Sequence, residues 1–193
     1  MLLRALGYST NADIFKAFNC IEKLKLNSAE IDSYIGSTVV DDVIDQKTGE
    51  IFLEGGVELT NDNLAELKEA KVKTIEVVNQ NKDFHSMMLL NTMIKDPSKN
   101  TEEALSIVYQ LLRSGEPPNL ETAQKFIERI FFNPKKYDLG EVGRYRLNQQ
   151  FALKVPVEST VLTMDDIIQV INFLVDMRKG ERGSDDIDHL GNR

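Results

Sequence analysis

The chain has 193 residues, 41% of them apolar and 7% aromatic, which is enough for one or two packed domains and too apolar for a disordered tail. With 31 acids, 23 bases, a net charge of −8 and a pI near 4.9, it is not expected to coat nucleic acid or anionic membrane through bulk charge. Cys20 is the single cysteine, which excludes an intrachain disulfide framework and a cysteine zinc cluster and favours the cytosol. No signal peptide and no run of about 20 apolar residues is found, so no membrane contact is expected.

The negative charge is concentrated in one segment. Between Glu30 and Asp83 there are 13 acids and 5 bases, a net charge of −8, whereas the rest of the chain balances at 18 and 18. Such a composition step predicts a separately packed unit, and the polar residues 27–28 and 79–81 on its flanks are typical of linkers. We expect a small domain inserted into a larger one. The alternative is one domain with a uniformly solvated acidic face.

The first half of the chain predicts a helix followed by a β-rich module. Apolar residues recur at steps of three and four from Asn11 to Leu26, which predicts a helix. Short β-branched runs at residues 38–40, 50–53 and 73–78 predict strands, with turn signals at residues 47–49 and 55–56. Thr60 is expected to cap a short helix between the second and third runs.

The second half predicts helices. Amphipathic spacing predicts helices over Glu102–Arg113 and Leu120–Phe131, separated by a Gly- and Pro-containing break. A final helix is expected to begin at Thr163, with Asp166 completing a capping box, and to end at Gly180. The predicted fold class is α+β with helices in the majority.

Two candidate chemical sites have weak support. Residues 185–189 (DDIDH) contain carboxylates and an imidazole that could bind Mg²⁺, Mn²⁺ or Zn²⁺, but adjacent side chains diverge, and a solvated acidic loop is the simpler interpretation. Cys20 lies where a small core residue is expected rather than a nucleophile. No glycine-rich phosphate loop is found.

One stretch is basic. Lys135, Lys136, Arg144 and Arg146 stand beside two tyrosines, a combination that can contact phosphates and stack on bases. An ordinary solvated helix start explains the pattern equally well.

Four blocks across the chain resemble signature runs of the bacterial RNA polymerase β subunit, in the order of that family. They are residues 2–8 (LLRALGY), 113–118 (RSGEPP), 137–148 (YDLGEVGRYRLN) and 185–193 (DDIDHLGNR). The resemblance implies that residues 1–32 and 81–193 form a mostly helical β2 or lobe domain. Residues 33–80 are similar to a lineage-specific insertion, a β–β′ module of the sandwich–barrel hybrid kind. No catalytic residue is implied for this segment, because the Mg²⁺-binding aspartates of the family lie elsewhere, and no cofactor is expected in it.

The resemblance also implies a DNA-facing role. The lobe lines the downstream DNA cleft and contacts the non-template strand, and Ile187, Asp188 and Arg193 match a pocket for a flipped-out guanine. A carboxylate suits the guanine N1–H and amine, and an arginine suits O6 or a phosphate. Arg113 and Lys136 match basic sites that face nucleic acid, although arginine is common where Lys136 stands. Arg144 matches a family arginine whose role is either DNA contact or a salt bridge.

Implied partners are the remaining core subunits (the rest of β, β′, α and ω), a sigma factor and promoter DNA, in the cytoplasm with the nucleoid. The acidic insertion is expected to dock a regulator or part of β′. A free-standing acidic interaction module is the alternative function, and a metal-dependent enzyme at residues 185–189 is a third. The abrupt end at Arg193 favours a segment of a longer protein over the free-standing module.

Overall fold

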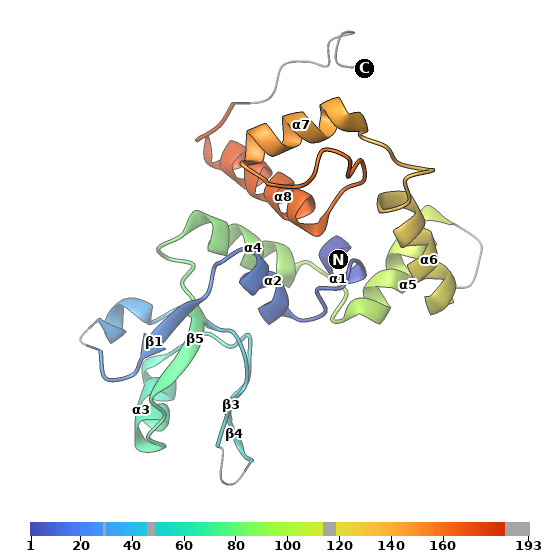
Figure 1. Cartoon of the computed structure of the whole chain (residues 1–193). Coiled ribbons are helices and arrows are strands. Elements are labelled where there is room, and N and C mark those ends of the chain that lie inside the picture. The colour runs from blue at the N-terminus through green and yellow to red at the C-terminus, as the bar shows by residue number, and fades with distance from the viewer. Residues whose placement is uncertain (29, 46–48, 114–118, 184–193) are drawn as a thin grey trace. The chain divides into compact units, whose positions relative to one another are not determined.

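The computed structural model describes residues 1–28, 30–45, 49–113 and 119–183, and the chain divides into two compact units (Figure 1). The first unit runs from Met1 to Tyr137, and the second begins at Asp138. Helices and short antiparallel sheets occur together, which confirms the α+β class. In the part of the chain that the structure describes, no helix is both long and apolar enough to cross a membrane.

The first unit begins and ends with helices and has a β-rich part between them. Its helices are α1 (Leu2–Ala5), α2 (Asn11–Ala17), the short 3₁₀ helix η1 (Ile31–Tyr34), α3 (Asn61–Glu69), α4 (Phe84–Ile94), α5 (Thr101–Leu112) and α6 (Leu120–Phe131). Its strands are β1 (Glu22–Lys25), β2 (Thr38–Val39), β3 (Val43–Ile44), β4 (Ile51–Leu53) and β5 (Thr74–Val78).

The β-rich part contains a three-stranded antiparallel sheet in the order β1-β5-β2 and a separate β3–β4 ladder. Leu24 faces Ile75 and Val39 faces Val77 across the first sheet. The core beneath this sheet combines apolar residues of the strands and of α3: Leu24, Leu26, Ile31, Val39, Leu53, Leu59, Leu64, Leu67, Ile75 and Val77. Because Leu24 and Leu26 belong to it, this core extends to residues before 33, the expected start of the module.

The helix expected over residues 11–26 is wrong in its second half. The helix ends at Ala17, Asn19 adopts a left-handed conformation with φ 54°, and residues 22–25 form β1. Phe18, Ile21 and Leu24 keep a helix-like spacing of three, but the backbone at β1 is extended because this segment pairs with β5. Cys20 therefore lies between helix and strand, where it is buried, as expected of a core residue.

Other predicted elements are confirmed. Thr60 caps α3 through a reciprocal capping box with Asn63. Helices α5 and α6 occupy the predicted ranges to within a residue and pack against each other, and Ala104, Leu105, Tyr109, Ala123 and Ile127 join Ala5 of α1 in a second core.

The second unit contains α7 (Gly140–Phe151) and α8 (Met164–Lys179), which pack against each other. The predicted capping box at the start of α8 is confirmed, with Thr163 as N-cap and Asp166 at the third position. Gly180 ends the helix with φ 87°, the left-handed conformation that glycine adopts without steric penalty. Residues 140–146 of the basic stretch lie at the start of α7, as the helix-start interpretation predicts, but Arg144 is buried rather than solvated.

Candidate nucleic-acid interface

The candidate DNA-binding residues fall into three groups. Arg113 and Lys136 lie on the surface of the first unit, and Arg144 is buried in the second. Ile187, Asp188 and Arg193, together with the candidate metal-binding run 185–189, lie outside the described residues. Within the described ranges, no group of three or more His, Cys, Asp or Glu side chains is arranged to hold a metal ion.

Arg113 follows the last turn of α5 and contacts an aromatic ring of α6. Its guanidinium carbon lies 5.3 Å from the centroid of the Phe126 ring. Arg129, one turn further along α6, places its guanidinium carbon 6.0 Å from the same centroid. Phe126 in turn packs edge-on against the buried Tyr109 of α5, with centroids 5.6 Å apart. The two helices thus fix a half-buried ring with two exposed cations beside it.

Lys135 and Lys136 lie in a tight turn after α6. The Asn133 side-chain oxygen accepts from the Lys135 N–H at 2.9 Å, and the Asn133 carbonyl accepts from the N–H groups of Lys136 and Tyr137, each at 2.9 Å. Both lysine side chains are exposed. The turn therefore presents two positive charges on an ordered backbone, which suits contact with phosphates.

Arg144 has a structural environment. Its side chain is 0% exposed, and its Nη1 lies 2.7 Å and 2.8 Å from the two carboxylate oxygens of Asp166, which is also 0% exposed. Nε donates to the Ser159 carbonyl at 2.7 Å, and Nη2 donates to the carbonyl of Val161. This placement is the salt-bridge alternative, and no guanidinium atom is exposed to a nucleic acid. Arg144 is therefore not among the DNA contacts proposed below.

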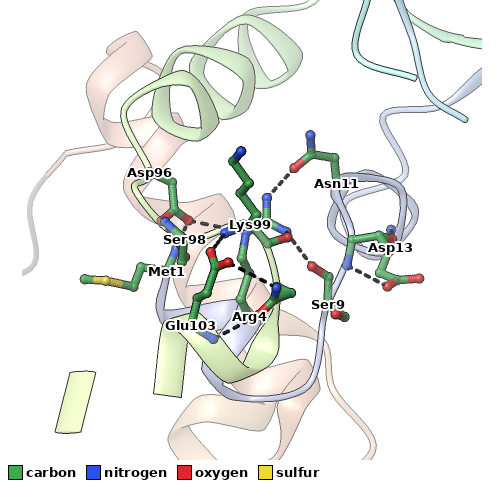
Figure 2. A network of polar contacts seen from close by, with 11 residues as sticks. Met1, Arg4, Ser9, Asn11, Asp13, Asp96, Ser98, Lys99 and Glu103 are labelled. Carbon is green, nitrogen blue, oxygen red and sulfur yellow. Dashed lines mark hydrogen bonds and ion pairs between the residues drawn. The ribbon is translucent and has the colours of Figure 1, made fainter. Parts of the chain in front are cut away.

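A buried polar network holds α1 against the start of α5 (Figure 2). Arg4, only 4% exposed, forms an ion pair with Asp96 over 3.5 Å and donates to the carbonyl of Lys99 at 3.3 Å and to the side chain of Asn11. Lys99 and Asp96 belong to the segment between α4 and α5, so this one guanidinium connects that segment with the starts of α1 and α2. The network fixes the N-terminal end of α5, the helix that Arg113 directly follows.

Asp96 has an unusually low pKa within this network. Burial alone would raise it, but hydrogen bonds from the Met1 amino group and from the Ser98 hydroxyl and N–H outweigh burial and lower the pKa to about 2. The carboxylate therefore stays ionised beside Arg4 at any ordinary pH.

The sequence motifs indicate no role for Arg4 or Arg129 and no pairing of Asp166. Arg4 stands inside the block at residues 2–8 but carries no local sign of burial. Arg129 lies three residues after Phe126 on one helix, a spacing at which side chains are neighbours, and this signal could have been found. Asp166 was predicted only as a helix cap; its pairing with Arg144 joins residues 22 positions apart and has no local signal.

Cys20 is unsuited to nucleophilic chemistry. Burial raises the pKa of its thiol, outweighing the opposing effect of a hydrogen bond with Ser86, and the thiol lies 3.5 Å from the carbonyl oxygen of Phe18. A thiol with a raised pKa contains less of the reactive thiolate at neutral pH.

Comparison with known sequences agrees with the four sequence blocks. The family described as RNA polymerase Rpb2, domain 2, matches residues 70–193. The DNA-directed RNA polymerase subunits beta of Flavobacterium psychrophilum and Porphyromonas gingivalis are each 36% identical over 209 aligned residues, and that of Leptospira biflexa is 35% identical over 203. Each alignment covers 100% of this chain, residues 33–80 included, and 16% of the relative. The chain thus spans about a sixth of the length of the curated relatives it matches, and it belongs to the RNA polymerase Rpb2 domain 2 family.

Proposed function

We propose that this chain is a non-catalytic segment of a bacterial DNA-directed RNA polymerase β subunit, acting in DNA-templated transcription as the lobe that lines the downstream DNA cleft. The observation that carries the proposal is the match of the whole chain to polymerase β subunits. Its partners would be the rest of β, β′, α, ω, a sigma factor and promoter DNA, in the bacterial cytoplasm. The parent enzyme would transfer nucleotidyl groups with Mg²⁺ bound by other segments.

Exposed cations in the first unit support a contact with the non-template strand. The chain is acidic overall, yet Arg113, Lys135 and Lys136 are exposed and form no ion pair with any carboxylate among the described residues. Local positive charge on an acidic protein directs a polyanion to one place and away from the rest of the surface.

The test compares charge-neutral variants in the complete polymerase. Arg113→Gln and Lys136→Gln should each lower promoter affinity and reduce the slope of log affinity against log salt by about 0.7 to 0.9, the contribution of one phosphate contact. Lys68→Gln is the matched control, because Lys68 is an exposed lysine on α3 within the acidic segment. Slopes equal to that of the control for both variants would contradict the proposed DNA contact.

The guanine pocket is proposed from the resemblance alone. Asp188 would accept hydrogen bonds from a flipped-out non-template guanine, and Ile187 and Arg193 are the other two positions that match the pocket by motif. Asp188→Ala in the complete polymerase should shorten the lifetime of open complexes on guanine templates towards that on thymine templates, without changing the rate of bond formation. Equal lifetimes on the two templates for the unmodified polymerase would contradict the pocket.

For the acidic segment we propose a docking role towards a basic partner, a regulator or part of β′. An open cavity of about 600 Å³ lies between the β3–β4 ladder and the segment from α3 to β5. Four acidic residues line it, together with two lysines: Asp41, Asp42, Asp45, Glu76, Lys71 and Lys73. The cross-strand pair Ile44 and Ile51 is about half exposed on the same ladder, at 50% and 52%. Acidic groups beside exposed apolar side chains suit a partner with basic and apolar residues.

Deletion of residues 33–80 tests this docking role through assembly, growth and response to transcription factors, but it also removes core residues that cover Leu24 and Leu26. The sharper variant is the exposed pair Ile44→Ser with Ile51→Ser, which leaves that core intact. Loss of factor response with normal assembly is expected. Unchanged assembly, growth and factor response in both the deletion and the double variant would contradict the docking role.

The free-standing interaction module predicts a different native size. If the chain is a segment of a polymerase subunit, an antibody raised against it should detect a band in a lysate that is far larger than 21.9 kDa and that co-elutes with transcription activity. A band at 21.9 kDa would instead support the free-standing alternative.

A further inference from the structure

We propose that Arg113 and Arg129, whose guanidinium carbons lie 5.3 Å and 6.0 Å from the centroid of the Phe126 ring, form a paired-guanidinium site that binds one phosphate-rich stretch of a nucleic-acid strand, with Arg129 as a contact that the sequence motifs do not indicate. This inference rests on the proposed function and deepens it by assigning a second arginine and an aromatic residue to the DNA-facing surface of the first unit.

The geometry brings together residues of two helices. Arg113 directly follows α5 and Arg129 lies in the last turn of α6, yet both guanidinium carbons lie within 6.0 Å of the Phe126 ring centroid. At that distance a guanidinium is attracted by the negative face of an aromatic ring. Both arginines therefore make a cation–π contact with the same ring.

Phe126 is itself held in place. Its edge-on contact with Tyr109, which is 4% exposed, and its packing against the core of α5 and α6 restrict the ring to one orientation. An arginine that rests on a fixed ring has fewer conformations to lose when it binds a ligand, so its N–H groups are positioned in advance.

Both guanidinium groups are available to an external anion. Their side chains are exposed, and neither makes an ion pair with a carboxylate among the described residues. By contrast, the neighbouring Lys125 of α6 is paired with Glu121 at 2.5 Å. Two planar donor groups near one ring suit the repeated oxygens of a phosphodiester backbone, which guanidinium binds in bidentate fashion.

The experiment measures the affinity of the assembled polymerase holoenzyme for a fluorescent promoter fragment over a series of salt concentrations. Arg129→Gln should reduce the slope of log affinity against log salt by about 0.7 to 0.9. The factor by which affinity decreases between 50 and 200 mM salt should therefore be about threefold smaller than for the wild type. Arg129→Lys, which keeps the charge and loses the planar fork, should lower affinity with little change in slope.

Two further variants separate the ring from the charges. Phe126→Leu keeps an apolar residue against the core but removes the aromatic support, so Arg129→Gln should have a smaller effect in that background than in the wild type. Lys125→Gln is the matched control, because it removes one positive charge from the same helix at a residue that is already paired with Glu121; it should leave the slope unchanged. Elongation rate on a preassembled scaffold should be normal for Lys125→Gln.

The outcomes distinguish this inference from the function on which it rests. If Arg129→Gln behaves as Lys125→Gln while Arg113→Gln and Lys136→Gln still lower the slope, the paired site is refuted and the DNA-facing role stands. If none of these variants changes the slope, both are refuted. If Arg129→Gln impairs assembly of the polymerase with unchanged DNA affinity, the pair binds an acidic protein surface instead, and the nucleic-acid site is refuted.

Discussion

Arg144 and Asp166 form an ion pair that is inaccessible to solvent on both sides, with Nη1 at 2.7 Å and 2.8 Å from the two carboxylate oxygens. Asp166 also accepts from the N–H and hydroxyl of Thr163, at 2.7 Å and 2.9 Å, and thereby completes the capping box of α8. One carboxylate thus fixes the beginning of α8 and binds the only charged group that α7 buries within the described residues. The pair is the main polar connection between the two helices of the second unit.

Removal of one partner of this pair should be strongly destabilising, because the other charge is left buried and unpaired. Arg144→Met and Asp166→Ala should each lower the free energy of unfolding of the second unit by about 3 to 5 kcal/mol. Urea denaturation of the 193-residue chain, followed by circular dichroism, measures the change. Arg178→Gln is the matched control, since Arg178 is an exposed arginine of α8, and it should change stability by less than about 0.5 kcal/mol. Equal effects of Arg144→Met and Arg178→Gln would contradict the structural role.

Asp96 predicts a specific acid sensitivity. Its pKa in the folded chain is about 2, against 3.8 for the free side chain, so its contribution to stability is complete above about pH 4 and disappears as the pH falls towards 2. The difference corresponds to about 2 kcal/mol. In the 193-residue chain, whose Met1 amino group is one of the donors to this carboxylate, Asp96→Asn should therefore lower stability at pH 7 and flatten the decrease of stability between pH 4 and pH 2, as measured by thermal unfolding. If the stability of the variant and of the parent decreases equally between pH 4 and pH 2, other carboxylates cause the acid sensitivity.

Elements whose signal lies within one continuous segment are predicted from the sequence, among them α5, α6 and the strands β2, β4 and β5, whereas β1 is not, for a physical reason. Helix α6 has its apolar face and its Asn119 cap within one continuous segment, so local spacing is sufficient to predict it. β1 depends on β5, some fifty residues away, and its own residues 22–25 (EKLK) contain only one apolar side chain. Its extended backbone is therefore determined by a partner that periodicity does not identify.

The same distinction applies to the candidate site. Arg113 and Lys136 could be selected from motif positions alone, and the structure places both on the surface. Whether Arg144 contacts DNA or forms a salt bridge depends on Asp166, which lies next to it only in the folded chain. The pairing of Arg113 with Arg129 likewise requires the packing of α5 on α6, because their shared contact is with a ring rather than along one helix.

Cys20 should resist thiol reagents while the chain is folded. Burial raises the pKa of its thiol, and the side chain is only 8% exposed. Labelling with a chromogenic disulfide reagent at pH 7.5 should be slow in buffer and should reach completion rapidly in 6 M guanidinium chloride, because only the unfolded chain exposes the thiol. Fast stoichiometric labelling in buffer would contradict the burial of Cys20.

Gly55 is predicted to tolerate no side chain, owing to the close approach of two backbone segments. A Cβ at this position would lie 2.8 Å from the carbonyl oxygen of Val40, and the Gly55 N–H donates to the Asp42 side chain at 2.7 Å, so the loop cannot move away without losing that bond. Gly55→Ala should destabilise the β-rich part by about 1 to 3 kcal/mol, measured as a lower thermal midpoint. Gly183→Ala is the matched control, because a Cβ there meets no atom within 4 Å and the backbone is free of positive φ. A thermal midpoint for Gly55→Ala equal to that of Gly183→Ala would show that the loop after β4 can shift to accept a methyl group.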